Sequence, residues 1–269
     1  MKLRVLVENN TYIDRYYWGE PAFSCLLEDG DTRVLFDVGY SDALLRNAAA
    51  MGLDLGEVSI VAISHGHDDH TRGLAYLREV ADLSRVTVTA HPDAFLRKTL
   101  DGKDIGAPFR EAQLRRFTNL RLSRVPVQLT SNAVFLGEIP ETFDFERRTP
   151  IGTIHPEREA ERADLLLDDT AIACRCRDGL FLLTGCSHSG ICNVAEHAKR
   201  VCGESRVCGI LGGFHLFRVD ERLRRTIDYF TENDIRILYP CHCVSFEAKA
   251  AIHAAIPIRE VGVGLLLDL

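Results

Sequence analysis

The chain has 269 residues, of which 46% are hydrophobic and 26% charged, enough apolar material to bury a sizeable core. The formal net charge is −7, and no basic run is interleaved with aromatic residues, which argues against a general nucleic-acid-binding surface. Residues 1–8 alternate apolar and charged side chains, a pattern typical of a strand rather than of a signal peptide or membrane span. We therefore expect a cytoplasmic protein with neither a nucleic-acid nor a membrane partner.

The nine cysteines support this location, because an odd number scattered through strand and helix patterns does not form a disulfide framework. Most are expected to be small buried residues. The pairs Cys174/Cys176 and Cys241/Cys243 raise the alternative of a structural zinc site. Neither pair has the two-residue spacer of a zinc knuckle, and two residues that share a strand face do not close around an ion. A separate cysteine-rich zinc site is therefore disfavoured.

The first part of the chain predicts the edge of a sheet followed by a helix. Strands are expected at residues 3–8, 22–29 and 33–37, with a turn at 29–31. The helix is expected at 41–51, with Ser41 as its N-cap. After the apolar run at 58–63, a second helix is expected at about 71–80.

The middle of the chain predicts an excursion from the sheet, at about residues 93–163. Residues 93–118 are rich in charge and are expected to be partly helical, strands return at 120–136, and the prolines of 139–163 indicate an irregular loop. Cations of the first segment either form a solvated helical face or reach over a site and bind an anionic group. They are Lys98, Lys103, Arg110, Arg115 and Arg116. From residue 164 onward, strands and helices alternate to the end.

The most informative segment is Ser64-His-Gly-His-Asp-Asp-His70. Imidazole and carboxylate are the usual ligands of zinc, iron and manganese in hydrolytic sites. The spacing divides into two pairs, His65/His67 and Asp69/His70, which indicates two adjacent metal ions. A polar turn after a strand is the alternative, and it is disfavoured because random turns rarely collect three histidines.

Three more histidines follow apolar runs in the same way. The runs at 180–183, 207–211 and 235–239 lead to His188, His215 and His242, as the run at 58–63 leads to His65. Strands joined through helices tend to run parallel, so their carboxyl ends meet at one rim of a sheet, where α/β folds place their sites. We expect these histidines to converge there. His91 also follows a strand pattern but is expected to support a ligand or to be structural, since Pro92 restricts the backbone around it and no second donor is nearby.

These motifs resemble the metallo-β-lactamase fold superfamily. Ser64–His70 is similar to its signature, and Leu35-Phe-Asp-Val-Gly39 to its second-strand motif. Narrower segments resemble the branch of the 7,8-dihydropterin-6-methyl-4-(ribofuranosyl)aminobenzene-5'-phosphate synthases. They are Gly137-Glu-Ile-Pro140, Asp168-Asp169, Gly185-Cys-Ser-His-Ser-Gly190, Gly212-Gly-Phe-His-Leu216 and Cys241-His-Cys243. The chain departs from that branch at Glu141, where arginine is usual, and at Cys243-Val244-Ser245, where Cys-Thr-Gly is usual.

The resemblance implies an α/β fold, an αββα sandwich with two mixed sheets packed face to face and helices outside, as one domain over residues 1–269. It implies one metal bound by His65, His67 and His188, and a second bound by Asp69, His70 and His242. Cys186 is an alternative to His188, and Asp168 or Asp169 is a further carboxylate candidate. Asp37 would accept a hydrogen bond from a ligand imidazole.

The implied enzyme is a metallo-hydrolase in which two divalent ions lower the pKa of a water, and the hydroxide attacks a small phosphorylated or pterin-like molecule. Zinc is the expected metal, with manganese and iron as alternatives. Asp69 is expected to orient the nucleophile or shuttle its proton. His215 is expected either to face the substrate as proton donor or oxyanion partner, or to support its neighbours.

Three alternative functions remain open at this stage. The first is the condensing synthase of the pterin branch, in which metals activate a leaving group for a carbon–nitrogen bond. The second is an iron-containing redox protein on the same fold, and the third is a sensing or binding module. The expected partner is a small anionic molecule, and the sequence leaves homo-oligomerisation open.

Overall fold

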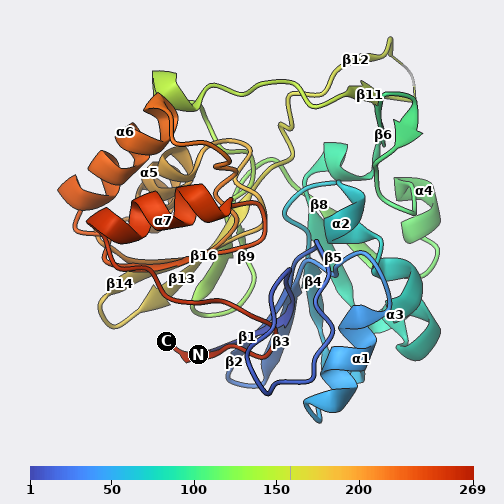
Figure 1. The fold of residues 1–269 in the computed structure, drawn as a ribbon. Coiled ribbons are helices and arrows are strands. Elements are labelled where there is room, and N and C mark those ends of the chain that lie inside the picture. Colours follow the sequence, from blue (N-terminus) through green and yellow to red (C-terminus); the bar gives the residue numbers. More distant parts are fainter. Residues whose placement is uncertain (158) are drawn as a thin grey trace. The chain divides into compact units, whose positions relative to one another are not determined.

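The computed structural model describes residues 1–157 and 159–269 as a mixed α/β protein with three sheets (Figure 1). Position 158, which falls within the predicted excursion, lies outside the described residues. The chain divides into two compact units. Unit 1 comprises Met1–Arg124, Thr149–Asp168 and Gly262–Leu269, and unit 2 comprises Val125–Arg148 and Asp169–Val261. The prediction of a single domain stays a prediction.

Unit 1 contains a seven-stranded sheet in the order β17-β1-β2-β3-β4-β5-β8. Its antiparallel part joins the chain ends, since β1 pairs with β17 and the Met1 amino group donates to the Leu269 carbonyl at 3.1 Å. Strands β3, β4, β5 and β8 are mutually parallel, so their carboxyl ends lie at the same edge. The strands are β1 (Lys2–Val7), β2 (Ser24–Asp29), β3 (Thr32–Phe36), β4 (Ile60–Ala62), β5 (Thr87–Ala90), β8 (Asn119–Leu122) and β17 (Leu266–Asp268).

The helices of unit 1 supply an apolar face to the core of this sheet. Leu44 of α1 (Ala43–Ala50) and Leu77 of α3 (Leu74–Val80) are buried in one cluster with Val61 and Val88. Helix α1 begins later than predicted, because Asp42 occupies the N-cap and the Ser41 hydroxyl accepts from the Ala43 N–H.

The helix predicted at 71–80 is divided into α2 (Asp68–Thr71) and α3, and Gly73 lies between them. A Cβ at Gly73 would lie 1.9 Å from the Val38 carbonyl oxygen, so only glycine allows this close approach of helix to strand end. The backbone N–H of Gly73 also donates to the Gly39 carbonyl.

A second, four-stranded antiparallel sheet lies in unit 1 and is formed by the predicted excursion. Its order is β12-β11-β6-β7, and β6 (Arg97–Leu100) and β7 (Lys103–Asp104) are strands in the segment predicted to be partly helical. Strands β11 (Thr153–His155) and β12 (Arg162–Ala163) come from the predicted irregular loop. Only the 3₁₀ turn η3 (Pro92–Phe95) and α4 (Glu111–Leu114) are helical among residues 93–118. The long-range pairing of β6 with β11 decides this structure, and local composition does not reveal it.

Unit 2 contains a six-stranded sheet in the order β16-β15-β14-β13-β10-β9. Strands β14, β15 and β16 are parallel, as predicted, and the others are antiparallel. The parallel pairing places the residues after β14, β15 and β16 at one edge of the sheet. The strands are β9 (Val127–Gln128), β10 (Ala133–Phe135), β13 (Ala171–Cys176), β14 (Gly179–Thr184), β15 (Val207–Gly212) and β16 (Ile237–Pro240).

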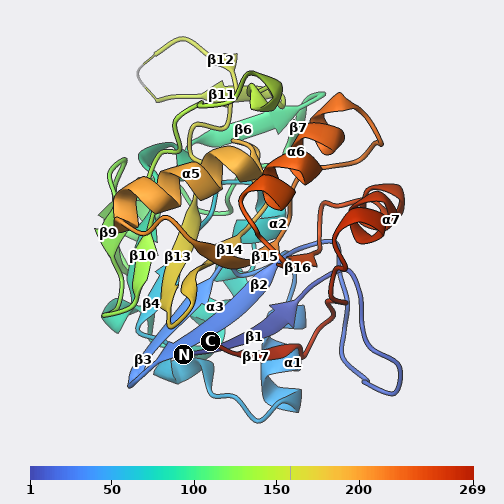
Figure 2. The ribbon, with the colours of Figure 1, turned by 90° about the vertical axis from the view of Figure 1, so that its left-hand side faces the viewer.

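The helices of unit 2 cover its sheet and share one core with it (Figures 1 and 2). They are α5 (Ile191–Cys202), α6 (Glu221–Glu232) and α7 (Phe246–Ala255). Their first turns are capped by side chains. Asp220 and Ser245 accept from the N–H groups of Leu223 and Ala248. The buried Glu146 of the turn η4 (Asp144–Glu146) accepts from the first N–H groups of α5.

Among the described residues, every helix is too short or too polar to span a membrane.

Candidate metal centre

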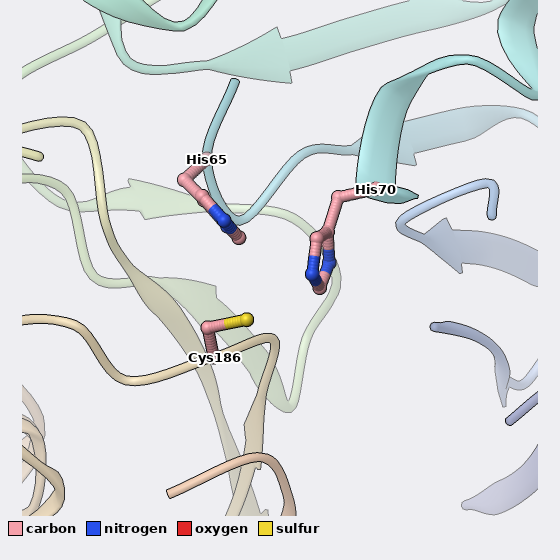
Figure 3. Close-up of side chains that lie close together, drawn as sticks. All are labelled: His65, His70 and Cys186. Atoms are coloured by element: carbon pink, nitrogen blue, oxygen red, sulfur yellow. The ribbon is translucent and has the colours of Figure 1, made fainter. Parts of the chain in front are cut away.

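The predicted ligands of unit 1 are gathered in the loop and short helix that follow β4. The rings of His65 and His70 have centroids 4.3 Å apart, and both side chains are fully buried (Figure 3). His65 Nε2 lies 3.1 Å from His67 Nδ1, and His70 Nε2 lies 3.4 Å from an Asp69 oxygen. These four side chains therefore lie close together, and their role as metal ligands stays a prediction. Three imidazoles and one carboxylate form a donor set that suits zinc, manganese or iron.

Asp37 holds the two ends of this ligand segment. Its carboxylate accepts from the Ser64 N–H, the Ser64 hydroxyl and His70 Nδ1, each at 2.7 Å. The hydrogen bond predicted from a ligand imidazole to Asp37 is therefore present. Because Nδ1 of His70 is engaged in this way, Nε2 is the nitrogen that faces Asp69.

The charges around these imidazoles set their protonation. Burial opposes a charge on His70, but the carboxylates of Asp69 and Asp37 outweigh it and raise the pKa of His70 well above 6.5. Burial, with the neighbouring Lys98 ammonium, lowers the pKa of His67 to about 4. At neutral pH, His67 therefore offers a free lone pair, whereas a metal must displace a proton from His70.

A buried ion-pair network fixes the backbone of the ligand loop. The fully buried Lys98 donates to Asp164 at 2.7 Å and to Asp168 at 2.9 Å. The second oxygen of Asp168 accepts from the Gly66 N–H at 2.7 Å. A Cβ at Gly66 would lie 2.1 Å from the Ala94 carbonyl, so the loop packs closely on the segment before β6. These hydrogen bonds run from Lys98 through Asp168 to Gly66. They thus link β6 to the residue between the two predicted ligands His65 and His67.

This network excludes Lys98 from both roles expected of the cations in residues 93–118, a solvated helical face and a contact with an anionic group, because its ammonium is buried between Asp164 and Asp168. It also gives Asp168 a structural role in place of the carboxylate ligand considered from sequence. Asp169 accepts from the N–H and hydroxyl of Ser189. Within the part of the chain that the structure describes, neither aspartate joins a group of metal-ligating atoms. His91 is structural, as predicted, because its Nδ1 accepts from the Asp93 N–H at 3.1 Å and so caps η3.

The predicted residues of unit 2 follow the carboxyl ends of its parallel strands. His188 and His215 have ring centroids 4.3 Å apart, after β14 and β15, and His242 follows β16. Ser187, His215 and His242 have φ values of 59°, 50° and 54°. This left-handed region is costly for non-glycine residues and concentrates at functional sites.

The electrostatics around His215 bear on its predicted role. Burial, followed by the charges of Arg222 and His242, lowers the pKa of His215 to about 4. His215 is therefore neutral at pH 7 and can donate a ring N–H or accept a proton. Its participation in the reaction stays a prediction.

Unit 2 also brings together the predicted ligand His242, the alternative ligand Cys186, and Cys243. The ligating atoms of Cys186, His242 and Cys243 all lie within 4.8 Å of one another. Cys186, also shown in Figure 3, follows β14, and the other two follow β16. The sequence pattern drew attention to Cys241 with Cys243, whereas the fold pairs Cys243 with Cys186. The useful signal was that both cysteines come directly after parallel strands.

Comparisons with known proteins identify the family. The model of the metallo-beta-lactamase superfamily matches residues 17–159, and the chain belongs to this superfamily. An uncharacterized protein of Methanocaldococcus jannaschii is 32% identical over 255 residues, which cover 91% of each chain. The 7,8-dihydropterin-6-methyl-4-(beta-D-ribofuranosyl)-aminobenzene-5'-phosphate synthase of the same organism is 27% identical, over 93% of this chain and 89% of its own.

Solved structures confirm the predicted fold class. Tm1679, a metal-dependent hydrolase of the β-lactamase superfamily, matches 100% of this chain and 99% of its own with a TM-score of 0.83 and 28% identity. A diphosphatase of the PhnP family matches with a TM-score of 0.55 and 15% identity, over 100% of this chain and 97% of its own, which shows a shared fold alone.

The Asp168 contact with Gly66 can be tested against a matched control. We expect Asp168→Asn to weaken metal binding by roughly 10-fold or more, the scale for residues that orient ligands. Asp164→Asn removes a similar contact to Lys98 but leaves the Gly66 N–H acceptor in place. Titration against a competing chelator measures both affinities, and thermal melts check that both variants fold. Equal losses of metal affinity in the two variants would show that the bond from Asp168 to Gly66 does not orient the ligands.

Metal binding should release protons in an amount set by these pKa shifts. At pH 7, uptake should displace the proton of His70, whose pKa is raised, and none from His67, whose pKa is about 4. Affinity should therefore increase as the pH rises toward the pKa of His70. Calorimetric titration in buffers of different ionisation enthalpy measures the number released. Asp37→Asn is expected to lower the pKa of His70 and so reduce the number of protons that metal binding releases at pH 7. The same number of released protons in this variant as in the wild-type protein would argue against His70 as their source.

Proposed function

We propose that the chain is a metal-dependent hydrolase with a binuclear centre. One ion would be held by His65, His67 and His188, and the other by Asp69, His70 and His242. The observation that carries the proposal is the packing of three imidazoles and a carboxylate after β4, oriented by Asp37 and Asp168. Membership of the superfamily and the 28% identity to a metal-dependent hydrolase support it.

When bound, divalent ions supply Lewis acidity that lowers the pKa of a water and offsets negative charge. The protein's own residues then have separate tasks. The Asp69 carboxylate, 28% exposed, can orient the nucleophilic water and take its proton. Asp37 keeps the His70 ring in one orientation. The neutral His215 can donate its ring N–H to an oxygen of the substrate that gains charge.

We propose a small, anionic, phosphorylated or pterin-like substrate. The relative named as a synthase supports this class, because its product carries a pterin and a phosphate. The cation-rich residues 93–118 also lie against the ligand loop within unit 1. The Asp68 N–H donates to the Ile105 carbonyl, and His67 forms an isolated β-bridge with Gly106. Arg110 is anchored beside this bridge by its bond to the Ala107 carbonyl.

A second candidate is the condensing synthase, favoured by the 27% identity to the enzyme of that name over most of both chains. The same donor sets would then assist departure of a leaving group as a carbon–nitrogen bond forms. Mass spectrometry of products formed from a dihydropterin and an aminobenzene-ribosyl phosphate distinguishes condensation from hydrolysis.

The hydrolase proposal predicts separable effects of two substitutions. His67→Ala should lose metal and activity together, while Asp69→Asn should keep at least one metal but lose rate by roughly 10²-fold or more, as expected for a general base. Elemental analysis for zinc, manganese and iron, with a panel of phosphodiesters and lactones, measures both. Near-normal turnover of Asp69→Asn would show that Asp69 is not the general base.

The anionic substrate predicts a selective effect of Arg110→Ala. Hydrogen bonds of charged groups contribute about 1.5–3 kcal/mol, so KM for phosphorylated substrates should rise roughly 10- to 100-fold. Neutral esters should be little affected. Arg115→Ala is the matched control, since Arg115 pairs with Glu111 along an exposed turn, whereas Arg110 contacts Asp104 and Ala107 beside the bridge. The same small loss in both variants, on both substrate types, would count against an anion contact at Arg110.

A further inference from the structure

We propose that unit 2 carries a binding site for an aromatic ring with an anionic substituent, formed by Phe217 and Arg222 near His215. The Phe217 ring would pack against the ring of the ligand, and the Arg222 guanidinium would donate to its anionic group. The inference rests on the proposed function for the kind of molecule that is bound, an anionic substrate. It deepens that proposal by naming an aromatic ring and the two residues that recognise it.

Phe217 presents an exposed aromatic ring beside the predicted ligands of unit 2. It is 53% exposed, and its ring centroid lies 4.8 Å from that of His215, with the two planes at 80°. His215 in turn lies against His188, with ring centroids 4.3 Å apart. The edge-to-face contact orients the Phe217 ring and leaves about half of the residue open to a ligand.

A neighbouring segment extends this exposed apolar edge. Leu216 and Val244 form an isolated parallel bridge, and the Ser245 N–H donates to the Leu216 carbonyl at 2.9 Å. Phe246, which is 82% exposed, begins α7 directly after this contact. Phe217 and Phe246 therefore lie on joined segments, which follow the parallel strands β15 and β16.

The area of these rings favours a small ligand over a second protein chain. At about 200 Å² for a whole aromatic side chain, Phe217 and Phe246 together expose roughly 270 Å². A stable protein interface buries about 800 Å² on each partner. Small-molecule sites, in contrast, combine a limited apolar surface with a few polar groups that fix orientation.

Arg222 supplies such a polar group, because its guanidinium lacks hydrogen-bond acceptors. Two other arginines of α6 form ion pairs, Arg224 with Glu221 at 3.4 Å and Arg225 with Asp144 at 2.9 Å. The Nε and Nη2 atoms of Arg222 are buried and have no hydrogen-bond partner among the described residues. Buried charged groups are normally paired, so an anionic ligand would provide the acceptor that these atoms lack.

The surroundings of Arg222 place it near the exposed ring. Its positive charge helps to lower the pKa of His215, the residue against which Phe217 packs. Glu146 is a carboxylate within electrostatic range of Arg222, but its oxygens accept from the first N–H groups of α5 at 3.0 and 2.7 Å. Arg222 is only partly buried, so part of the residue is open to solvent.

The experiment measures the binding of phenylphosphonate and methylphosphonate to the full-length protein by calorimetry. Arg222→Gln should weaken the binding of both probes roughly 10-fold or more, because both lose a charge-assisted hydrogen bond. Phe217→Leu should weaken only phenylphosphonate, roughly 3- to 10-fold, since it keeps an apolar side chain but removes the ring. Phe217→Tyr retains the ring and should bind both probes as the wild-type protein does.

Arg224→Gln is the matched control, because it removes an exposed arginine of the same helix, and it should bind both probes normally. A crystal structure of the wild-type protein with phenylphosphonate keeps the test decisive if Arg222→Gln fails to fold. The phosphonate at Arg222 with the phenyl ring at Phe217 supports the site, and a probe that contacts neither residue overturns it.

The fate of this site and that of the hydrolase proposal can be told apart. Unchanged affinities of Arg222→Gln and Phe217→Leu for both probes overturn the site, while hydrolysis of the substrate panel leaves the hydrolase proposal intact. Probe binding that depends on both residues, in a protein that hydrolyses no member of the panel, supports the site while the hydrolase proposal fails.

Discussion

The Asp37 carboxylate is the contact on which the geometry of the ligand segment depends. It is fully buried, and a buried carboxylate is tolerated only when hydrogen bonds replace its hydration. Here the replacements are the Ser64 N–H and hydroxyl at one end of the motif and His70 at the other. The same bonds that satisfy the charge therefore fix the spacing of the imidazoles. Loss of Asp37 would both free His70 and remove one of the charges that raise its pKa.

Residues with a left-handed backbone conformation mark positions where the fold tolerates a local conformational cost because the position of the side chain requires it. Asp37, Ser187, His215 and His242 all have positive φ values directly beyond strand ends. Aspartate tolerates this conformation better than histidine, because its short side chain bonds nearby backbone. Next to His242, the Cys241 N–H donates to the Gly212 carbonyl at 3.0 Å and so joins the segment after β16 to the end of β15. Such positions are hard to recognise from sequence, since the tertiary contacts that impose them come from other strands.

Much of the candidate site could be predicted because two rules act locally. Apolar β-branched runs predict buried strands, and parallel strands place their carboxyl ends together, so His65, His188, His215 and His242 were assigned to strand ends correctly. Lys98 was misread because its partners, Asp164 and Asp168, lie more than sixty residues away in sequence. Strands β11 and β12 were missed for the same reason, as their pairing depends on β6 rather than on propensity.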